Sequence, residues 1–124
     1  MSETYTELEK QTIAVVDAQL AAYNARDIDA FIATYHDDIE ISLFSAGPQI
    51  QGKQALKDRY GQKFSDLKYL HATSLKRIVQ GNYLVDHELA ESASEDPNKI
   101  DNSVRVIAAY EVLDGLIVRV SFMG

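Results

Sequence analysis

The sequence predicts an α+β fold, in which three N-terminal helices pack on one face of a strongly curved, mostly antiparallel sheet. Two observations support this prediction. Three segments of the first half carry apolar residues at intervals of three and four, which is the period of an amphipathic helix. From residue 68 onward, long β-like segments follow one another in pairs, and each pair is joined by a two-residue turn signal. Helices followed by a meander of strands are typical of a single α+β domain.

Two helices are expected in succession at the start of the chain. The first should begin at Thr4 or Thr6, each of which has a Glu three residues later in the capping-box pattern, and should run to about Asn24. Gln19 falls inside its apolar stripe. Asp27 is a suitable N-cap for a second, short helix. The two apolar stripes are Ile13, Val16, Leu20 and Tyr23, and then Ile28, Phe31, Ile32 and Tyr35.

The remaining elements follow from changes of period and from turn residues. Residues 39–44 (IEISLF) alternate as a strand, and the AGP sequence after them indicates a turn. A third helix should follow Gly52. Two hairpins are expected after it, with turns at Gly81-Asn82 and Asp114-Gly115; their strands are 68–80, 83–91, 104–113 and 116–123. The first five or so residues and the stretch near 92–103 are expected to be unstructured.

Composition limits the function classes. A chain of 124 residues is expected to form one domain with one core. The net charge of -7, with scattered Lys and Arg, argues against nucleic acid or an anionic membrane surface as partner. The absence of Cys excludes disulfides, a thiolate nucleophile and a cysteine zinc site. The N-terminus is polar, and no run approaches the roughly 18 apolar residues of a membrane span, so a cytoplasmic protein is expected.

Hairpin geometry predicts which residues face one another across the strands. Counting back from Gly81-Asn82 pairs residue 77 with 86 and residue 75 with 88, so Arg77 lies opposite Asp86 with Glu88 on the diagonal. His71 is expected on the same face. Periodicity alone leaves open whether this face is the outside of the sheet or lies under the helices.

The second hairpin is expected to pair Tyr110 with Arg119 on the helix-covered side. Both faces of this hairpin are largely apolar, so both should be covered. The helices cover one, and a second copy of the chain is the expected cover of the other, which predicts a homodimer through the outer sheet face.

Three segments resemble a known family: VVDAQLAAYNARDIDAFIATYHDDIEI, IQGKQALKDRY and AAYEVLDGLIVRVSF. They are similar to the SnoaL-like branch of the nuclear transport factor 2-like (cystatin-like cone) superfamily, which includes ketosteroid isomerase. The resemblance covers nearly the whole chain in order, so residues 1–124 are expected to form a single domain of this type. It implies a cone with an internal pocket and agrees with a sheet-mediated dimer. The superfamily hosts isomerases, dehydratases, epoxide hydrolases, cyclases and binding domains, so the resemblance implies a fold and no particular reaction.

The resemblance also suggests that Asp86 and Glu88 point into the cone. Together with Arg77 they would then be the candidate catalytic group. Charges removed from water must be paired. An Arg lowers the pKa of a carboxylate that it contacts, whereas a second carboxylate in a dry place beside a like charge has its pKa raised, and such a separation suits acid/base chemistry. The alternative is a solvated ion pair on the outside of the sheet.

Four further residues are candidates for substrate binding. Gln19 lines up where ketosteroid isomerase has a tyrosine that donates to an oxyanion; the alternative is a core Gln bonded to backbone. Tyr110, with Arg119 beside it, would orient a substrate, or be an ordinary core tyrosine. His71 would be a base near pH 7, or a structural histidine. The isomerase's two catalytic aspartates line up with Leu43 and Ala108, so its own mechanism is not expected here.

The sequence therefore favours a cofactor-independent enzyme that performs acid/base chemistry, of isomerase, hydrolase or dehydratase type, on a small apolar metabolite. Arg77 between acidic residues has the residue types of the epoxide hydrolases of this superfamily, although their order along the strands differs. No metal site is expected, since neither His36-Asp37-Asp38 nor the strand residues have a diagnostic spacing. The alternative is a non-catalytic small-molecule-binding or dimerisation domain, and a protein-interaction module ranks last.

Overall fold

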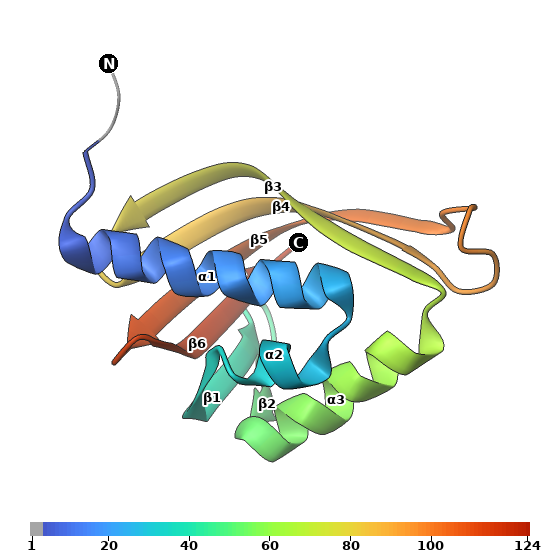
Figure 1. Cartoon of the computed structure of the whole chain (residues 1–124), viewed down its shortest axis with the longest axis horizontal. Helices are drawn as coiled ribbons and strands as arrows, with labels where there is room; N and C mark the ends of the chain where they lie inside the picture. The colour runs from blue at the N-terminus through green and yellow to red at the C-terminus, as the bar shows by residue number, and fades with distance from the viewer. Residues whose placement is uncertain (1–3) are drawn as a thin grey trace.

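The structure is a computed structural model that describes residues 4–124. Three helices, α1 (Glu7–Ala25), α2 (Ile28–Ile32) and α3 (Lys53–Asp66), cover one face of a six-stranded sheet (Figure 1). The predicted α+β class is confirmed. Of the first five residues, predicted to be unstructured, residues 1–3 lie outside the described residues, and Thr4 and Tyr5 have no regular secondary structure.

The two N-terminal helices begin where their capping residues predict. The Thr6 hydroxyl accepts a hydrogen bond from the Glu9 amide at 3.1 Å, and the Glu9 carboxylate accepts one from the Thr6 amide at 2.9 Å. Asp27 caps α2 by accepting from the Ala30 amide at 3.1 Å. The second helix is shorter than predicted, because it ends at Ile32 and Tyr35 already belongs to the first strand.

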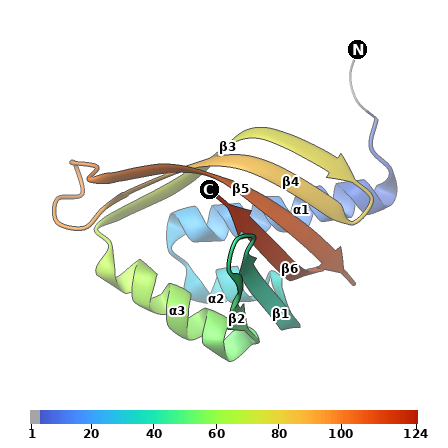
Figure 2. The same cartoon turned by 180° about the vertical axis from the view of Figure 1, so that it is seen from behind.

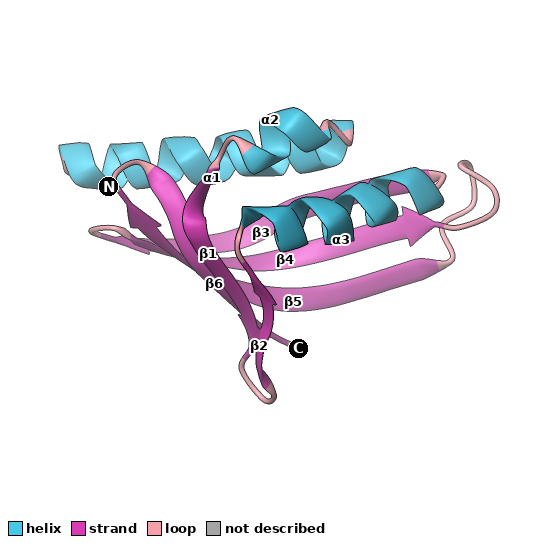
Figure 3. Cartoon of the chain, turned by 90° about the horizontal axis from the view of Figure 1, so that it is seen from below, coloured by secondary structure: helices cyan, strands magenta, loops and turns pink. Residues whose placement is uncertain are grey.

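The sheet has the order β2-β1-β6-β5-β4-β3, and all neighbours are antiparallel except β1 and β6. Figure 3 shows β1, β2 and β6 turned steeply against β3–β5, so the sheet curls beneath the helices without closing. Both predicted hairpin turns are confirmed. The strands are β1 (Tyr35–Leu43), β2 (Gly47–Gln51), β3 (Tyr69–Gln80), β4 (Tyr83–Ala93), β5 (Asn102–Leu113) and β6 (Leu116–Met123).

Two strand predictions were wrong. The edge strand β2 was missed because Gly47 and Pro48 indicate a turn, although an edge strand tolerates a proline. The loop predicted near residues 92–103 is shorter than expected. Strands β4 and β5 extend into this stretch and leave only residues 94–101 between them.

Two β-bulges change the predicted register. Arg77 pairs with Asp86 as predicted, but the register shifts between Ser74 and Lys76, so that Ser74 pairs with Glu88 and Leu75 is the extra residue. A one-residue shift moves every side chain beyond it to the other face.

The second bulge lies between β5 and β6. The register shifts between Glu111 and Val112, so Glu111 pairs with Arg119 and Tyr110 pairs with Val120. The predicted pairing of Tyr110 with Arg119 is therefore wrong.

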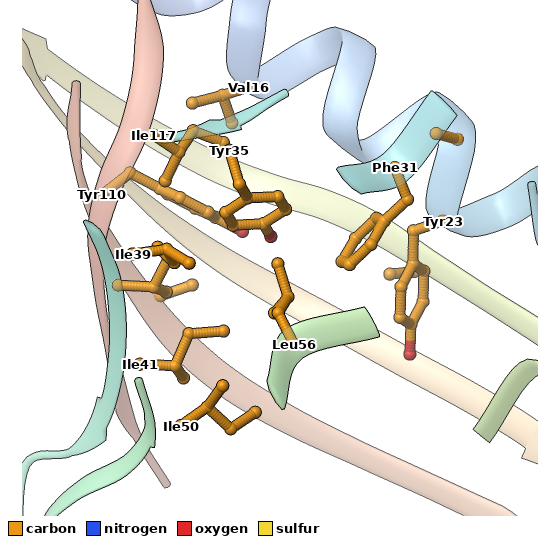
Figure 4. Packing of buried hydrophobic residues seen from close by; sticks show 14 of the residues in the cluster. Val16, Tyr23, Phe31, Tyr35, Ile39, Ile41, Ile50, Leu56, Tyr110 and Ile117 are labelled. Atoms are coloured by element: carbon orange, nitrogen blue, oxygen red, sulfur yellow. The ribbon is translucent and has the colours of Figure 1, made fainter. Parts of the chain in front are cut away.

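The core lies between the helices and the curled sheet (Figure 4). Phe31 of α2 is fully buried, and its ring centroid lies 5.0 Å from that of Tyr35 and 4.8 Å from that of Tyr60. Tyr23 of α1 joins the same cluster, 6.1 Å from Phe31. These aromatic contacts fix α1, α2 and α3 above β1, and the space they leave on the sheet becomes the pocket.

Figure 2 shows the outer face of the sheet, which no helix of residues 4–124 covers. Large apolar side chains are exposed on it, including Ile78 at 69% and Ile107 at 39%. Together with Lys76, Val85 and His87 they form a shallow groove of about 250 Å³.

Candidate functional site

A pocket of about 200 Å³ opens between the helices and the concave face of the sheet. Its wall combines apolar side chains with four tyrosines, one amide, one carboxyl group and one ammonium group. Three of the seven site residues predicted from the sequence line it: Gln19, Glu88 and Tyr110. The other lining residues are Leu20, Tyr23, Tyr35, Tyr60, Lys63, Ala72, Ala90, Val104, Val106 and Phe122.

Beside the pocket, Arg77 and Asp86 form a two-pronged ion pair. The Arg77 Nε lies 2.6 Å from Asp86 Oδ1 and its Nη2 lies 2.9 Å from Oδ2. Asp86 is fully buried on the helix-covered side of the sheet, so the pair is not an exterior one. The bulge at Leu75 turns Ser74 inward, and its hydroxyl donates to Asp86 Oδ1 at 3.0 Å. Hydrogen bonding to Asp86 raises the pKa of Arg77.

Arg77 has a second acidic partner that was not predicted. Its Nη1 lies 2.7 Å from Oδ1 of Asp17, a half-exposed residue of α1. We predicted Glu88, not Asp17, as the second carboxylate beside Arg77. No signal in the sequence identifies Asp17, because the height of α1 over the hairpin depends on tertiary packing. Arg77 therefore joins helix α1 to strand β4 through two aspartates.

Glu88 is the carboxyl group that lines the pocket. Only 7% of the residue is exposed, and its Oε2 accepts a hydrogen bond from the Tyr110 hydroxyl at 3.1 Å. Burial, followed by the negative charge of Asp86, raises the pKa of Glu88 to about 7, although Tyr110 and Arg77 act in the opposite direction. A carboxyl group with this pKa is present in both its protonated and its ionised form near neutral pH.

Gln19 of α1 is buried in the pocket wall, at 7% exposure. Hydrogen bonding with Gln19 lowers the pKa of Tyr35, against a larger increase caused by burial. Its Oε1 has no hydrogen-bond partner among residues 4–124. The alternative of a core glutamine bonded to the backbone is therefore wrong for this oxygen.

The four tyrosines of the wall remain protonated at neutral pH. Burial raises the pKa of Tyr23 to about 12 and raises those of Tyr35, Tyr60 and Tyr110. Each is thus a neutral hydrogen-bond donor. Of these four tyrosines only Tyr110 was predicted at the site, because a helical stripe that contains tyrosines looks the same for a core as for a pocket wall.

Lys63 of α3 was also not predicted at the site. Its ammonium nitrogen lies 5.2 Å from the centroid of the Tyr23 ring and 5.6 Å from that of Tyr60. The side chain is largely exposed, yet partial desolvation and the nearby Arg59 lower its pKa. It has no ion-pair partner within the described range.

His71 and Arg119 lie outside the pocket. Because of the bulge at Leu75, His71 pairs with Glu91 and points away from the face that carries Ala72 and Ala90. Arg119 is 61% exposed and forms an ion pair of 2.8 Å with Glu111 on the outer side. Both expectations failed for the same reason, since each assumed an unbroken register.

Residues 4–124 show neither a metal-binding cluster nor a membrane-spanning helix. No group of three or more His, Asp or Glu side chains in that range is arranged to hold a metal ion. None of the helices described there is long and apolar enough to cross a membrane.

Comparison with known proteins supports the fold. The model of the SnoaL-like domain family matches residues 16–120. Among curated proteins, none matches the sequence. Similar solved structures include an uncharacterized cystatin-fold protein from Novosphingobium aromaticivorans, with a TM-score of 0.81, 22% identity, and coverage of 91% of this chain and 97% of that one.

Two other similar structures have names that mention an activity. A LEH-like epoxide hydrolase of M. tuberculosis has a TM-score of 0.78 and 17% identity, with 93% of this chain and 83% of that chain covered. A protein of Jannaschia sp. CCS1 that is described as a SnoaL-like polyketide cyclase has a TM-score of 0.80 and 14% identity, with 98% and 90% covered. At these identities the likeness shows a shared fold alone.

Proposed function

Because the chain belongs to the SnoaL-like domain family, we propose that it is a cofactor-independent enzyme that performs acid/base chemistry on a small apolar molecule in the pocket. The single observation that carries this proposal is Glu88. It is a buried carboxyl group in a pocket wall, and its pKa is raised to about 7. A general acid or base is most effective when its pKa lies near the working pH.

The pocket supplies the other requirements of proton transfer. Its wall is mostly apolar, which excludes bulk water from a bound molecule. Tyr110 fixes the Glu88 carboxyl by a hydrogen bond, and the hydroxyl groups of Tyr35 and Tyr60 are available as donors to a substrate oxygen. Isomerisation, hydrolysis and dehydration all need such a proton transfer, and the proposal covers these three types.

Asp86 and Arg77 act through Glu88 in this proposal. Asp86 is fully buried by its contacts with Arg77 and Ser74, and it is not among the lining residues of the pocket. Its negative charge helps to raise the pKa of Glu88. Asp86 is therefore a positioning residue, and Arg77 holds it in place.

A non-catalytic binding domain is the second candidate. The observation that favours it is that Glu88 is the one carboxyl group among the described lining residues, so no second acid faces it across the pocket. A binding protein would use Glu88 and Tyr110 to hold a polar group of the ligand, without turnover.

The experiment is a turnover screen with apolar secondary alcohols, enones and epoxides, followed by mass spectrometry and chiral chromatography. The Glu88→Gln variant keeps the shape of the side chain and removes proton transfer, so we expect turnover to fall at least about 100-fold while binding is retained. Glu95→Gln, in the exposed loop between β4 and β5, is the matched control. Turnover that is undiminished in Glu88→Gln contradicts the role of Glu88, and saturable binding without turnover supports the second candidate.

We also propose that a second copy of the chain covers the outer sheet face. The support is the exposed apolar surface around Ile78 and Ile107, which is costly to leave in water. In a two-fold dimer the same groove would be buried on both copies.

A further inference from the structure

Helix α1 contributes Leu20, the phenol of Tyr23 and one amide, that of Gln19, to the pocket wall. Gln19 is more than nine-tenths buried, and its Oε1 has no partner among residues 4–124. A buried carbonyl oxygen without a hydrogen bond is unfavourable, and a small side-chain rotation that opens Oε1 to the adjoining pocket would let a bound molecule supply the missing partner.

The two ends of the amide are not equivalent. Hydrogen bonding of Gln19 to Tyr35 stabilises the ionised phenol, which requires the donating NH₂ end to face that hydroxyl. The oxygen is then the free end. An amide oxygen only accepts hydrogen bonds, so the group that satisfies it must carry an O–H or an N–H.

The surroundings decide between a charged and a neutral donor. The positive charge of Lys63, in the same pocket wall, disfavours an ammonium group, and Glu88, whose pKa is raised to about 7, offers a full negative charge to a cation only above that pH. Leu20, Val104 and Phe122 supply apolar surface that suits a hydrocarbon body. These features favour an uncharged hydroxyl on an otherwise apolar molecule.

We propose that the ligand of this pocket is an apolar alcohol or enol whose hydroxyl donates a hydrogen bond to Gln19 Oε1. The inference deepens the proposed function, since it names the substrate class of the same pocket. It also reverses the role that the resemblance suggests, in which Gln19 would donate to a substrate oxyanion. Gln19 thus selects a hydroxyl over a carbonyl at the same position.

The test is a binding measurement that needs no turnover. Three probes of nearly equal shape, 2-tetralol, 2-tetralone and tetralin, are titrated into the full chain, with amide NMR shifts as the readout. We expect the wild type to bind the alcohol about fivefold more tightly than the ketone, as one hydrogen bond allows. Gln19→Leu should bring this ratio to about one. Gln54→Leu, on exposed α3 surface, should leave it unchanged.

Gln19→Glu provides a second variant, which keeps an acceptor at the site and removes the amide donor. The alcohol preference should persist or grow in it. Binding of the ketone as tightly as the alcohol by the wild type, or saturable binding of none of the probes, overturns the inference. A wild-type preference that survives in Gln19→Leu overturns it too. Because turnover is not measured, loss of the proposed enzyme activity and loss of this inference are separate results.

Discussion

The raised pKa of Glu88 makes the stability of the folded chain depend on pH. Below about pH 4.5 the group is protonated in both the folded and the unfolded state. Between 4.5 and about 7 the unfolded chain releases the proton and the folded chain keeps it, so the free energy of unfolding falls as the pH rises. At 1.36 kcal/mol per pH unit, the full loss above pH 7 is about 3 kcal/mol.

The variant Glu88→Gln removes this loss, because an amide of the same shape does not ionise and its oxygen still accepts the hydrogen bond from Tyr110. We expect the variant and the wild type to be similarly stable near pH 4.5. Near pH 8 the variant should be more stable by about 3 kcal/mol, or about 10 °C in melting temperature. Urea unfolding followed by circular dichroism, at several pH values between 4.5 and 8, measures the difference.

Comparing the two proteins at each pH cancels the other titrating groups that they share. Glu95→Gln serves as the control. Because this side chain is exposed, the free energy of unfolding of the variant should differ from that of the wild type by the same amount at every pH. If the difference between Glu88→Gln and the wild type is equally flat, Glu88 ionises in the folded chain as it does in water. The pocket would then be too wet to support the acid/base role.

Two further predictions concern the ion pairs and the outer face. Asp86→Ala leaves Arg77 without its buried partner and should lower the free energy of unfolding by about 3–5 kcal/mol, whereas Asp17→Ala breaks a half-exposed pair and should lower it by less than about 1 kcal/mol. If urea unfolding shows that the two variants lose the same free energy of unfolding, the difference in burial between Asp86 and Asp17 does not determine their contributions. Light scattering should show a dimer that Ile78→Asp dissociates and that Phe44→Asp, at an exposed loop position off this face, leaves intact. A wild-type monomer at micromolar concentration would contradict the dimer.

The sequence predicted pairings well only near the turns. The pairing of Arg77 with Asp86 was predicted correctly, because each residue lies only four positions from the Gly81-Asn82 turn and no bulge intervenes. The predicted register is wrong from Leu75 onward, away from the turn. The sequence does not reveal the bulge, since a bulge residue resembles any other strand residue. The same failure on β6 separated Arg119 from Tyr110.

The site was predicted in part for a related reason. Gln19 and Glu88 line the pocket as predicted: the apolar stripe of the first helix placed Gln19 on the buried side, whereas the family resemblance alone pointed Glu88 inward. Their chemical roles remain predictions. Asp17 and Tyr60 were missed because their places depend on how a helix docks on the sheet, which is a tertiary property that no local period encodes.

The bulge at Leu75 decides which side chains of β3 reach the pocket wall. Because Leu75 is the extra residue, Ala72 and Ser74 face the helices, whereas the same sequence in an unbroken register would turn His71 and Thr73 toward them. Deleting Leu75 would keep Ser74 opposite Glu88 and Ala72 opposite Ala90, so the wall would keep its present side chains. A bulge two residues nearer the start of β3 would instead place Leu75 opposite Glu88 and remove the Ser74 hydroxyl from Asp86. The position of one unpaired strand residue therefore selects which chemical groups this sheet offers to a ligand.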